Sequence, residues 1–181
     1  ITINQNSKLK IIEKEAFSGT SINQISISEN VQELKEGWCN NTKKLENIFV
    51  SPNNEHYLSI KNKIIVEKSV DIMQNEFSVL TFACRDIENF TVPSYIKQIN
   101  SFTFYDCLNL KSIQFSKNSE LFLFGKSSLA FTSIESIVIP SSVMFINEEC
   151  FFQCQKLKSI EFEKDSKLQI IDKNAFSGTL I

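Results

Sequence analysis

The sequence contains little arginine, histidine and glycine, and each shortage argues against one kind of site. Arg85 is the only arginine and the net charge is −2, so recognition of phosphate groups by arginine and binding of nucleic acid are not expected. The four glycines form no glycine-rich phosphate loop. His56 is the only histidine and lies in a polar run that predicts a loop, which argues against a general base. The longest apolar runs, such as 120–125 and 136–140, are too short to span a bilayer, so direct membrane insertion is not expected.

A pattern of apolar residues recurs along the whole chain. In its clearest copy the anchor Ile146 is followed at +5 by Phe151, at +8 by Cys154, and then by a strand pattern with apolar residues at every second position, ending at Phe162. Equivalent anchors are Ile12, Leu34, Ile99, Phe124 and Ile171. Repeats with a period of a few tens of residues predict a solenoid, in which each coil packs on its neighbours.

The spacing of the anchors shows one interruption. Successive anchors lie 22 or 25 residues apart, whereas Leu34 and Ile99 are separated by 65 residues, which we interpret as one oversized unit. Within it, 57–60 and 64–66 flank Lys61-Asn62-Lys63 and predict a hairpin, because asparagine tolerates the left-handed turn conformation. We therefore expect one domain over 1–181 with about seven coils: regular repeats at 1–50 and 95–181 and an irregular unit at 51–94.

The positions that recur in the pattern predict the core. We expect one buried row of aromatic rings at the +5 position, with Trp38 filling the volume in the coil that has Cys39 at +5. Its members are Phe17, Phe104, Phe151 and Phe176. The +8 slot holds only threonine or cysteine, which predicts compact side chains that satisfy backbone groups inside the turn.

The five cysteines are an odd number and do not indicate a disulfide framework. Cys107 and Cys154 occupy the +8 slot and Cys84 holds the same position one coil earlier, so we expect buried, reduced thiols. A disulfide between Cys84 and Cys107 stays an alternative, because adjacent coils lie about 4.8 Å apart. Cys150 and Cys154 are four residues apart without a third ligand nearby, so neither a metal nor a cofactor is expected.

Two surfaces are candidates for binding a protein partner. The first is the outward face of the long strands. Its side chains are short, polar and nearly uncharged, and it carries no constellation of catalytic residues. Its candidate contact residues are Gln24, Asn47, Phe49, Gln114, Val138 and Glu161. The second is an apolar patch formed across two adjacent coils, on the side opposite the long strands, by Phe122, Met144 and Phe145.

The apolar patch has an alternative interpretation, which is local packing under the preceding loop. One class of coil always has an apolar residue directly before its anchor, at Ile11, Leu123 and Ile170. This regularity favours a structural role with those side chains tucked inward. Replacing the three patch residues by lysine or glutamine would separate the two interpretations.

The repeat resembles the BspA-like leucine-rich repeat family, whose form is L-x-x-I-x-x-x-A-F-x-x-C-x-x-L-x-x-I-x-[IF]-P. The best matches are 9–27, 96–115, 143–162 and 168–181, and the insert at 57–92 resembles the irregular unit of the family. Trp38-Cys39 in place of Ala-Phe, and Leu129 in place of Phe, depart from the form. The resemblance implies a leucine-rich-repeat right-handed superhelix without catalysis. It also implies a non-catalytic, protein-binding segment of a cell-surface or secreted adhesin-like protein, the alternative being an intracellular scaffold or spacer.

The two ends and two sequons complete the predictions. Ile1–Ile3 and Leu180–Ile181 look like pieces of interrupted strands, so we expect a fragment of a longer array that self-associates or frays at its ends. No signal peptide is visible, which says nothing in such a fragment. Asn40 and Asn89 begin N-x-S/T sequons, but an asparagine-rich chain contains two such matches by chance about as often as not.

Overall fold

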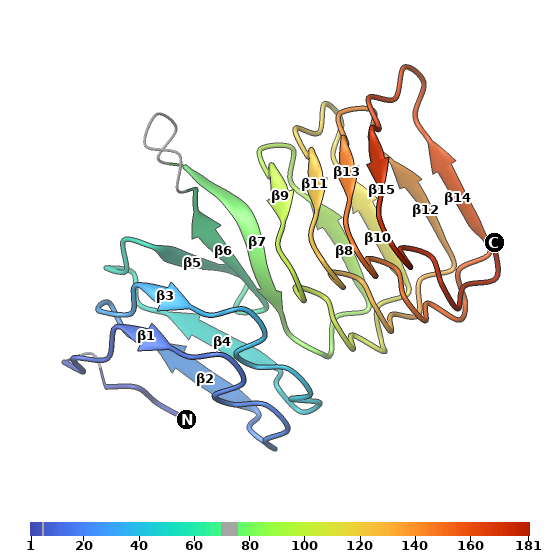
Figure 1. Ribbon diagram of the computed structural model, residues 1–181. Helices are drawn as coiled ribbons and strands as arrows, with labels where there is room; N and C mark the ends of the chain where they lie inside the picture. Colours follow the sequence, from blue (N-terminus) through green and yellow to red (C-terminus); the bar gives the residue numbers. More distant parts are fainter. Residues whose placement is uncertain (5, 70–75) are drawn as a thin grey trace.

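The computed structural model describes residues 1–4, 6–69 and 76–181. Over these residues the chain is a β-solenoid of about seven turns without a helix, which confirms the predicted fold class. Most coils run through a short strand, a turn and a long strand, so the strands form two layers (Figure 1). Part of the predicted irregular unit, 70–75, lies outside the described residues.

The short strands begin one residue before each anchor. They are β1 (Ile11–Ile12), β3 (Glu33–Leu34), β9 (Gln98–Ile99), β11 (Leu123–Phe124), β13 (Phe145–Ile146) and β15 (Ile170–Ile171). The long strands are β2 (Gln24–Ile27), β4 (Asn47–Val50), β8 (Asn89–Val92), β10 (Ser112–Phe115), β12 (Ser136–Ile139) and β14 (Ser159–Phe162). Corresponding strands of neighbouring coils pair in parallel, for example β11 with β13 and β12 with β14.

The irregular unit contains the hairpin that the sequence predicts. Strands β5 (Tyr57–Ile60) and β6 (Ile64–Lys68) pair antiparallel, and Lys61 and Asn62 between them have φ values of 50° and 56°. Strand β7 (Phe77–Ala83) pairs antiparallel with β6 and parallel with β9. The order β15-β13-β11-β9-β7-β6-β5 makes one seven-stranded sheet, whereas β1 and β3 form a separate pair.

The core lies between the two layers and contains most of the predicted residues. Five of the six anchors are buried, whereas Ile171 is exposed. Phe104 and Phe151 are fully buried, and the ring of Phe151 stacks on that of Phe176 with a centroid distance of 5.1 Å. The row is not uniformly buried as predicted: Phe17 and Phe176 are half-buried, since a neighbouring coil covers only one side of each.

Trp38 fills the core of its coil, as the sequence predicts. Its side chain is buried and its ring centroid lies 5.2 Å from that of Phe82 and 6.1 Å from that of Phe17. The +8 slot behaves as expected as well. Thr20, Thr42 and Thr179 each donate a hydroxyl hydrogen bond of 2.7–2.9 Å to the carbonyl oxygen three residues earlier, inside the turn.

Each regular turn contains two residues with positive φ, at +3 and +7 from the anchor. The +3 residues are Glu15, Gly37, Phe102, Ser127, Glu149 and Asn174. The +7 residues are Gly19, Asn41, Asp106, Phe131, Gln153 and Gly178. This conformation points the backbone N–H toward the next coil: Phe102 donates to the carbonyl of Lys126 (3.0 Å) and Phe131 to that of Phe152 (2.9 Å). The backbone bond between coils sets the conformation, and the side chain is free to vary.

Candidate interaction surfaces

The structure brings the three residues of the predicted apolar patch together. The carbonyl oxygen of Phe122 accepts hydrogen bonds from the N–H groups of Met144 (2.9 Å) and Phe145 (3.1 Å), so the two coils meet at these residues. All three side chains are half-buried. Phe145 lies in β13 between Leu123 of β11 and Ile170 of β15. Phe145 is therefore part of an apolar row with Leu123 and Ile170 on the outward face of the seven-stranded sheet, and Phe122 and Met144 directly precede this row in their coils.

The prediction of inward-tucked side chains at Ile11, Leu123 and Ile170 is wrong for Ile11 and Ile170. Ile11 is 42% exposed and Ile170 is 49% exposed, and Leu123 is half-buried. The reason is the alternation of side chains in extended backbone: the anchor points into the core, so the residue before it points outward. Leu123 and Ile170 flank Phe145 in the parallel ladder and add to the apolar surface around it, whereas Ile11 lies in the separate β1–β3 pair.

The six predicted contact residues of the long strands lie on the opposite layer. Gln24, Phe49, Gln114, Val138 and Glu161 are exposed, and Asn47 is half-buried. Inward-facing Ile25, Ile48 and Ile137 are buried on the same strands, as strand alternation requires. The outward face is polar except for Phe49 and Val138, which belong to strands on either side of the irregular unit.

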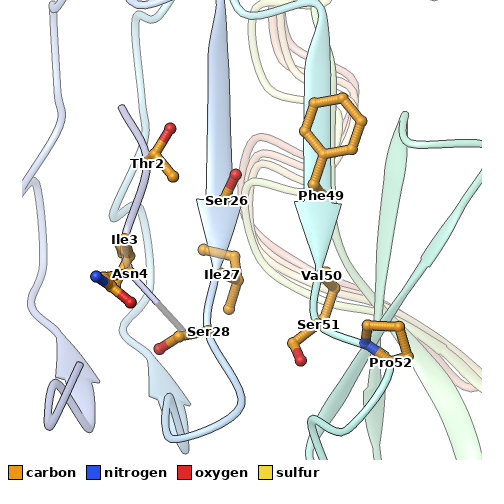
Figure 2. Close-up of a pocket in the computed structure, with 10 residues that line it drawn as sticks. All are labelled: Thr2, Ile3, Asn4, Ser26, Ile27, Ser28, Phe49, Val50, Ser51 and Pro52. Atoms are coloured by element: carbon orange, nitrogen blue, oxygen red, sulfur yellow. The ribbon is translucent and has the colours of Figure 1, made fainter. Parts of the chain in front are cut away.

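A hollow of about 720 Å³ opens beside Phe49. Figure 2 shows the ring of Phe49 on β4 next to the small side chain of Ser26 on β2, with Thr2 beyond it and Pro52 at the end of the strand. In the register of the ladder Phe49 faces Ser26, and Ser26 bridges to Thr2. The hollow therefore lies where one large side chain stands next to the small side chains of the neighbouring coils, and the described residues that line it are uncharged.

The cysteine thiols and the guanidinium of Arg85 are buried. Burial raises the pKa of the Cys39 thiol to about 11 and that of Cys84 to about 12. Arg85 is buried, with Nη1 donating to Cys107 Sγ (3.2 Å) and the guanidinium 4.6 Å from the centroid of the Phe82 ring. No three His, Cys, Asp or Glu side chains in the described part of the chain lie where they could share a metal ion.

The repeat pattern and the coil geometry are matched by a family model. A model of the BspA type leucine-rich repeat region, with six copies, matches residues 1–81 and 75–181. The chain belongs to the BspA-type leucine-rich repeat family. Members of this family and fold are typically non-catalytic scaffolds, and the family suggests a protein-binding repeat scaffold. No curated protein matches the chain.

Solved leucine-rich repeat proteins share the fold. The pneumococcal vaccine antigen PcpA is 20% identical with a TM-score of 0.74, over 96% of this chain and 44% of its own. A leucine-rich repeat protein from Eubacterium ventriosum is 17% identical with a TM-score of 0.63, over 100% of this chain and 64% of its own. A leucine-rich cell surface protein from Faecalibacterium prausnitzii is 22% identical with a TM-score of 0.53, over 94% of this chain and 54% of its own. The chain spans less than two thirds of each, and the likeness shows the fold.

Among residues 1–4, 6–69 and 76–181 there is no helix with the length and apolar character needed to cross a membrane.

The only histidine of the sequence, His56, is half-buried just before β5, and it lines a surface groove together with Glu67 and Lys68. Its ring centroid lies 6.5 Å from that of Tyr57. Sequence reasoning placed it correctly in a polar connection.

Sequence reasoning missed a third surface, a strip of four half-buried rings on the turn edge. The ring centroids lie 5.5 Å apart for Phe102 and Tyr105, 5.4 Å for Tyr105 and Phe131, and 5.6 Å for Phe131 and Phe152. Phe102 and Phe131 have φ values of 59° and 60°, a conformation that costs a bulky residue about 1–2 kcal/mol. The signal in the sequence is an aromatic residue at turn positions where other copies of the repeat carry Gly, Ala, Asn, Ser, Asp, Glu or Gln.

Proposed function

We propose that this chain is a non-catalytic, protein-binding segment of a cell-surface or secreted adhesin-like protein, and that it binds its partner through the apolar row around Phe145. The observation that carries the proposal is the continuity of Phe122, Leu123, Met144 and Phe145 across two adjacent coils. Contiguous apolar surface rimmed by polar residues often marks an interaction site. The fold is shared with a leucine-rich cell surface protein, which supports an extracellular role.

The position of the row in the solenoid supports a binding role. Strands β11 and β13 are covered on both sides by β9 and β15, so the exposure of their side chains does not come from an end of the stack. The positions equivalent to Phe122 and Met144 carry Lys10, Gln32, Lys97 and Gln169 in the other regular coils. An apolar side chain at this position is therefore a feature of two coils and is not required by the repeat.

The test is a triple variant in which Phe122, Met144 and Phe145 are each replaced by glutamine. Purified wild-type and variant chains are compared by biolayer interferometry against immobilised extracellular-matrix proteins, and by thermal unfolding. We expect at least one matrix protein to bind the wild type and to lose roughly tenfold or more in affinity for the variant, because truncating a few central apolar residues removes most interface energy. Thermal unfolding stays cooperative.

The matched control is Phe49→Gln with Val138→Gln, which removes exposed apolar surface from the opposite layer. It is expected to leave binding unchanged. If the triple variant loses thermal stability while its binding is unchanged, the three side chains are local core and the proposal is wrong. A wild-type chain that binds none of the matrix proteins also contradicts it.

A further inference from the structure

We propose that Phe102, Tyr105, Phe131 and Phe152 form a docking strip for an extended segment of a partner protein that carries lysine or arginine side chains. The strip lies on the turns after β9, β11 and β13, which run side by side (Figure 1). It is separate from the apolar row on the seven-stranded sheet. A partner can therefore engage it independently of the proposed function of that row.

The fold does not require aromatic rings at these positions. At +3 and +7 the backbone adopts positive φ so that its N–H can bond to the next coil, whatever the side chain. Phe102 and Phe131 occupy this conformation, which suits glycine or asparagine and is rare for a bulky residue. Gly37 and Asn41 occupy the same two positions in another coil. The fold therefore explains the backbone conformation at these positions but not the aromatic side chains that occupy them in these coils.

The four rings form one continuous surface across three coils. Successive rings meet edge to face, with interplanar angles of 67°, 72° and 78°. Each ring is half-buried, so each has one part packed against its neighbour and another part in solvent. Aromatic rings with these properties are enriched at protein interfaces.

The charges beside the strip select a cationic partner. Asp106 follows Tyr105 directly in the turn, and Glu149 lies at the +3 position next to Ser127, whose hydroxyl donates to it (3.2 Å). Neither carboxylate forms an ion pair within the described ranges, whereas neighbouring Glu148 is paired with Lys126 at 2.7 Å. Both carboxylates contribute, after burial, to raising the pKa of Tyr105, and the guanidinium of Arg85 acts in the opposite direction. Carboxylates beside ring faces favour lysine and arginine through charge and cation–π attraction.

The test measures binding of short fluorescent peptides by anisotropy. The probe is a peptide that alternates lysine with leucine, and its counterpart alternates glutamate with leucine. The variant is Phe102→Gly with Phe131→Asn, which installs the residues that Gly37 and Asn41 supply elsewhere and relieves the strained backbone. We expect the lysine peptide to bind the wild type and to bind the variant roughly tenfold more weakly. The thermal midpoint of the variant is unchanged or higher, so loss of folding cannot explain the loss of binding.

A second variant, Asp106→Asn with Glu149→Gln, is expected to weaken binding of the lysine peptide and to reduce its salt dependence. The triple glutamine variant of the sheet face is expected to bind the peptide like the wild type, which separates this proposal from the proposed function. Equal binding of the glutamate peptide, or unchanged binding by the Phe102→Gly, Phe131→Asn variant, would overturn the proposal. A neutral oligosaccharide that binds the strip in place of the lysine peptide would overturn it too.

Discussion

The backbone N–H of Leu34 donates a hydrogen bond of 2.8 Å to the phenol oxygen of Tyr57. Leu34 lies in β3 and Tyr57 in β5, and these strands belong to different sheets. This hydrogen bond therefore connects the first coils to the irregular unit, at a place where β3 and β5 are not paired in one sheet. Asn54 supports it by accepting a hydrogen bond from the Tyr57 N–H (2.8 Å) and donating to the carbonyls of Ser28 and Val31.

Tyr57→Phe is expected to destabilise the chain by about 1–3 kcal/mol, because it leaves the N–H of Leu34 buried without a partner. Chemical denaturation measures the loss. Tyr95→Phe is the matched control, since Tyr95 is 46% exposed and loses no buried bond. Equal stability of the two variants would show that the join does not depend on the phenol.

Glu67→Gln is expected to change how stability depends on pH. Burial raises the pKa of Glu67 above its ordinary value of 4.5, and hydrogen bonds from Thr81 and Tyr57 offset part of the shift. At pH values between 4.5 and the raised pKa, the folded chain therefore binds more protons than the unfolded chain. The contribution of this group to stability is complete below pH 4.5 and is lost as the pH rises through the folded-state pKa.

Replacing Glu67 by glutamine removes that loss. Denaturation curves at several pH values should show the free energy of unfolding of the variant rising relative to that of the wild type as the pH rises through this window. At higher pH the difference between the two should be constant. Glu163→Gln, at an exposed carboxylate, is the control and should follow the wild type. A difference between Glu67→Gln and wild type that does not vary with pH would contradict the prediction.

Phe151→Ala should cost roughly 3–5 kcal/mol, because the ring is fully buried between the coils of Phe124 and Phe176 and its removal leaves a cavity. Phe162→Ala, at a ring that is 42% exposed, is the comparison and should cost much less. Thermal or urea unfolding measures both. Similar costs for the two would mean that the aromatic row does not support the core.

All five cysteines are free and buried. Burial raises the pKa of every one of these thiols, to about 11 for Cys39 and about 12 for Cys84, so few thiolates exist at neutral pH. We expect no alkylation of the native chain on the timescale in which an unfolded chain reacts completely. Mass spectrometry after alkylation without reductant, with and without denaturant, measures this. A bond between Cys84 and Cys107 would appear as two thiols that resist alkylation in denaturant.

The 181-residue chain is expected to self-associate or fray at its ends in solution. Four apolar side chains near one end, those of Ile170, Ile171, Leu180 and Ile181, are between 49% and 62% exposed. Exposed apolar surface of this kind favours association. Sedimentation velocity at rising concentration checks it, and hydrogen exchange reports fraying. A monomer at all concentrations with protected ends would contradict the expectation.

The sequence alone was sufficient for the coil and its inward face. The anchors, the threonine or cysteine at +8 and the alternating apolar residues of the long strands repeat in register, and each is decided by local side-chain direction. The hairpin at Lys61-Asn62 was predictable for the same reason, since its turn chemistry is local.

Only the tertiary structure decided which outward side chains meet. Phe102, Tyr105, Phe131 and Phe152 come from three coils, and their contact depends on how the turns stack. The side chain of Ile11 was assigned inward from its regular recurrence, but its place in a two-residue strand turns it outward. The bond from Leu34 to Tyr57 likewise joins a regular coil to the irregular unit. A repeat specifies what lies inside each coil, whereas contacts between coils depend on the register and twist that packing produces.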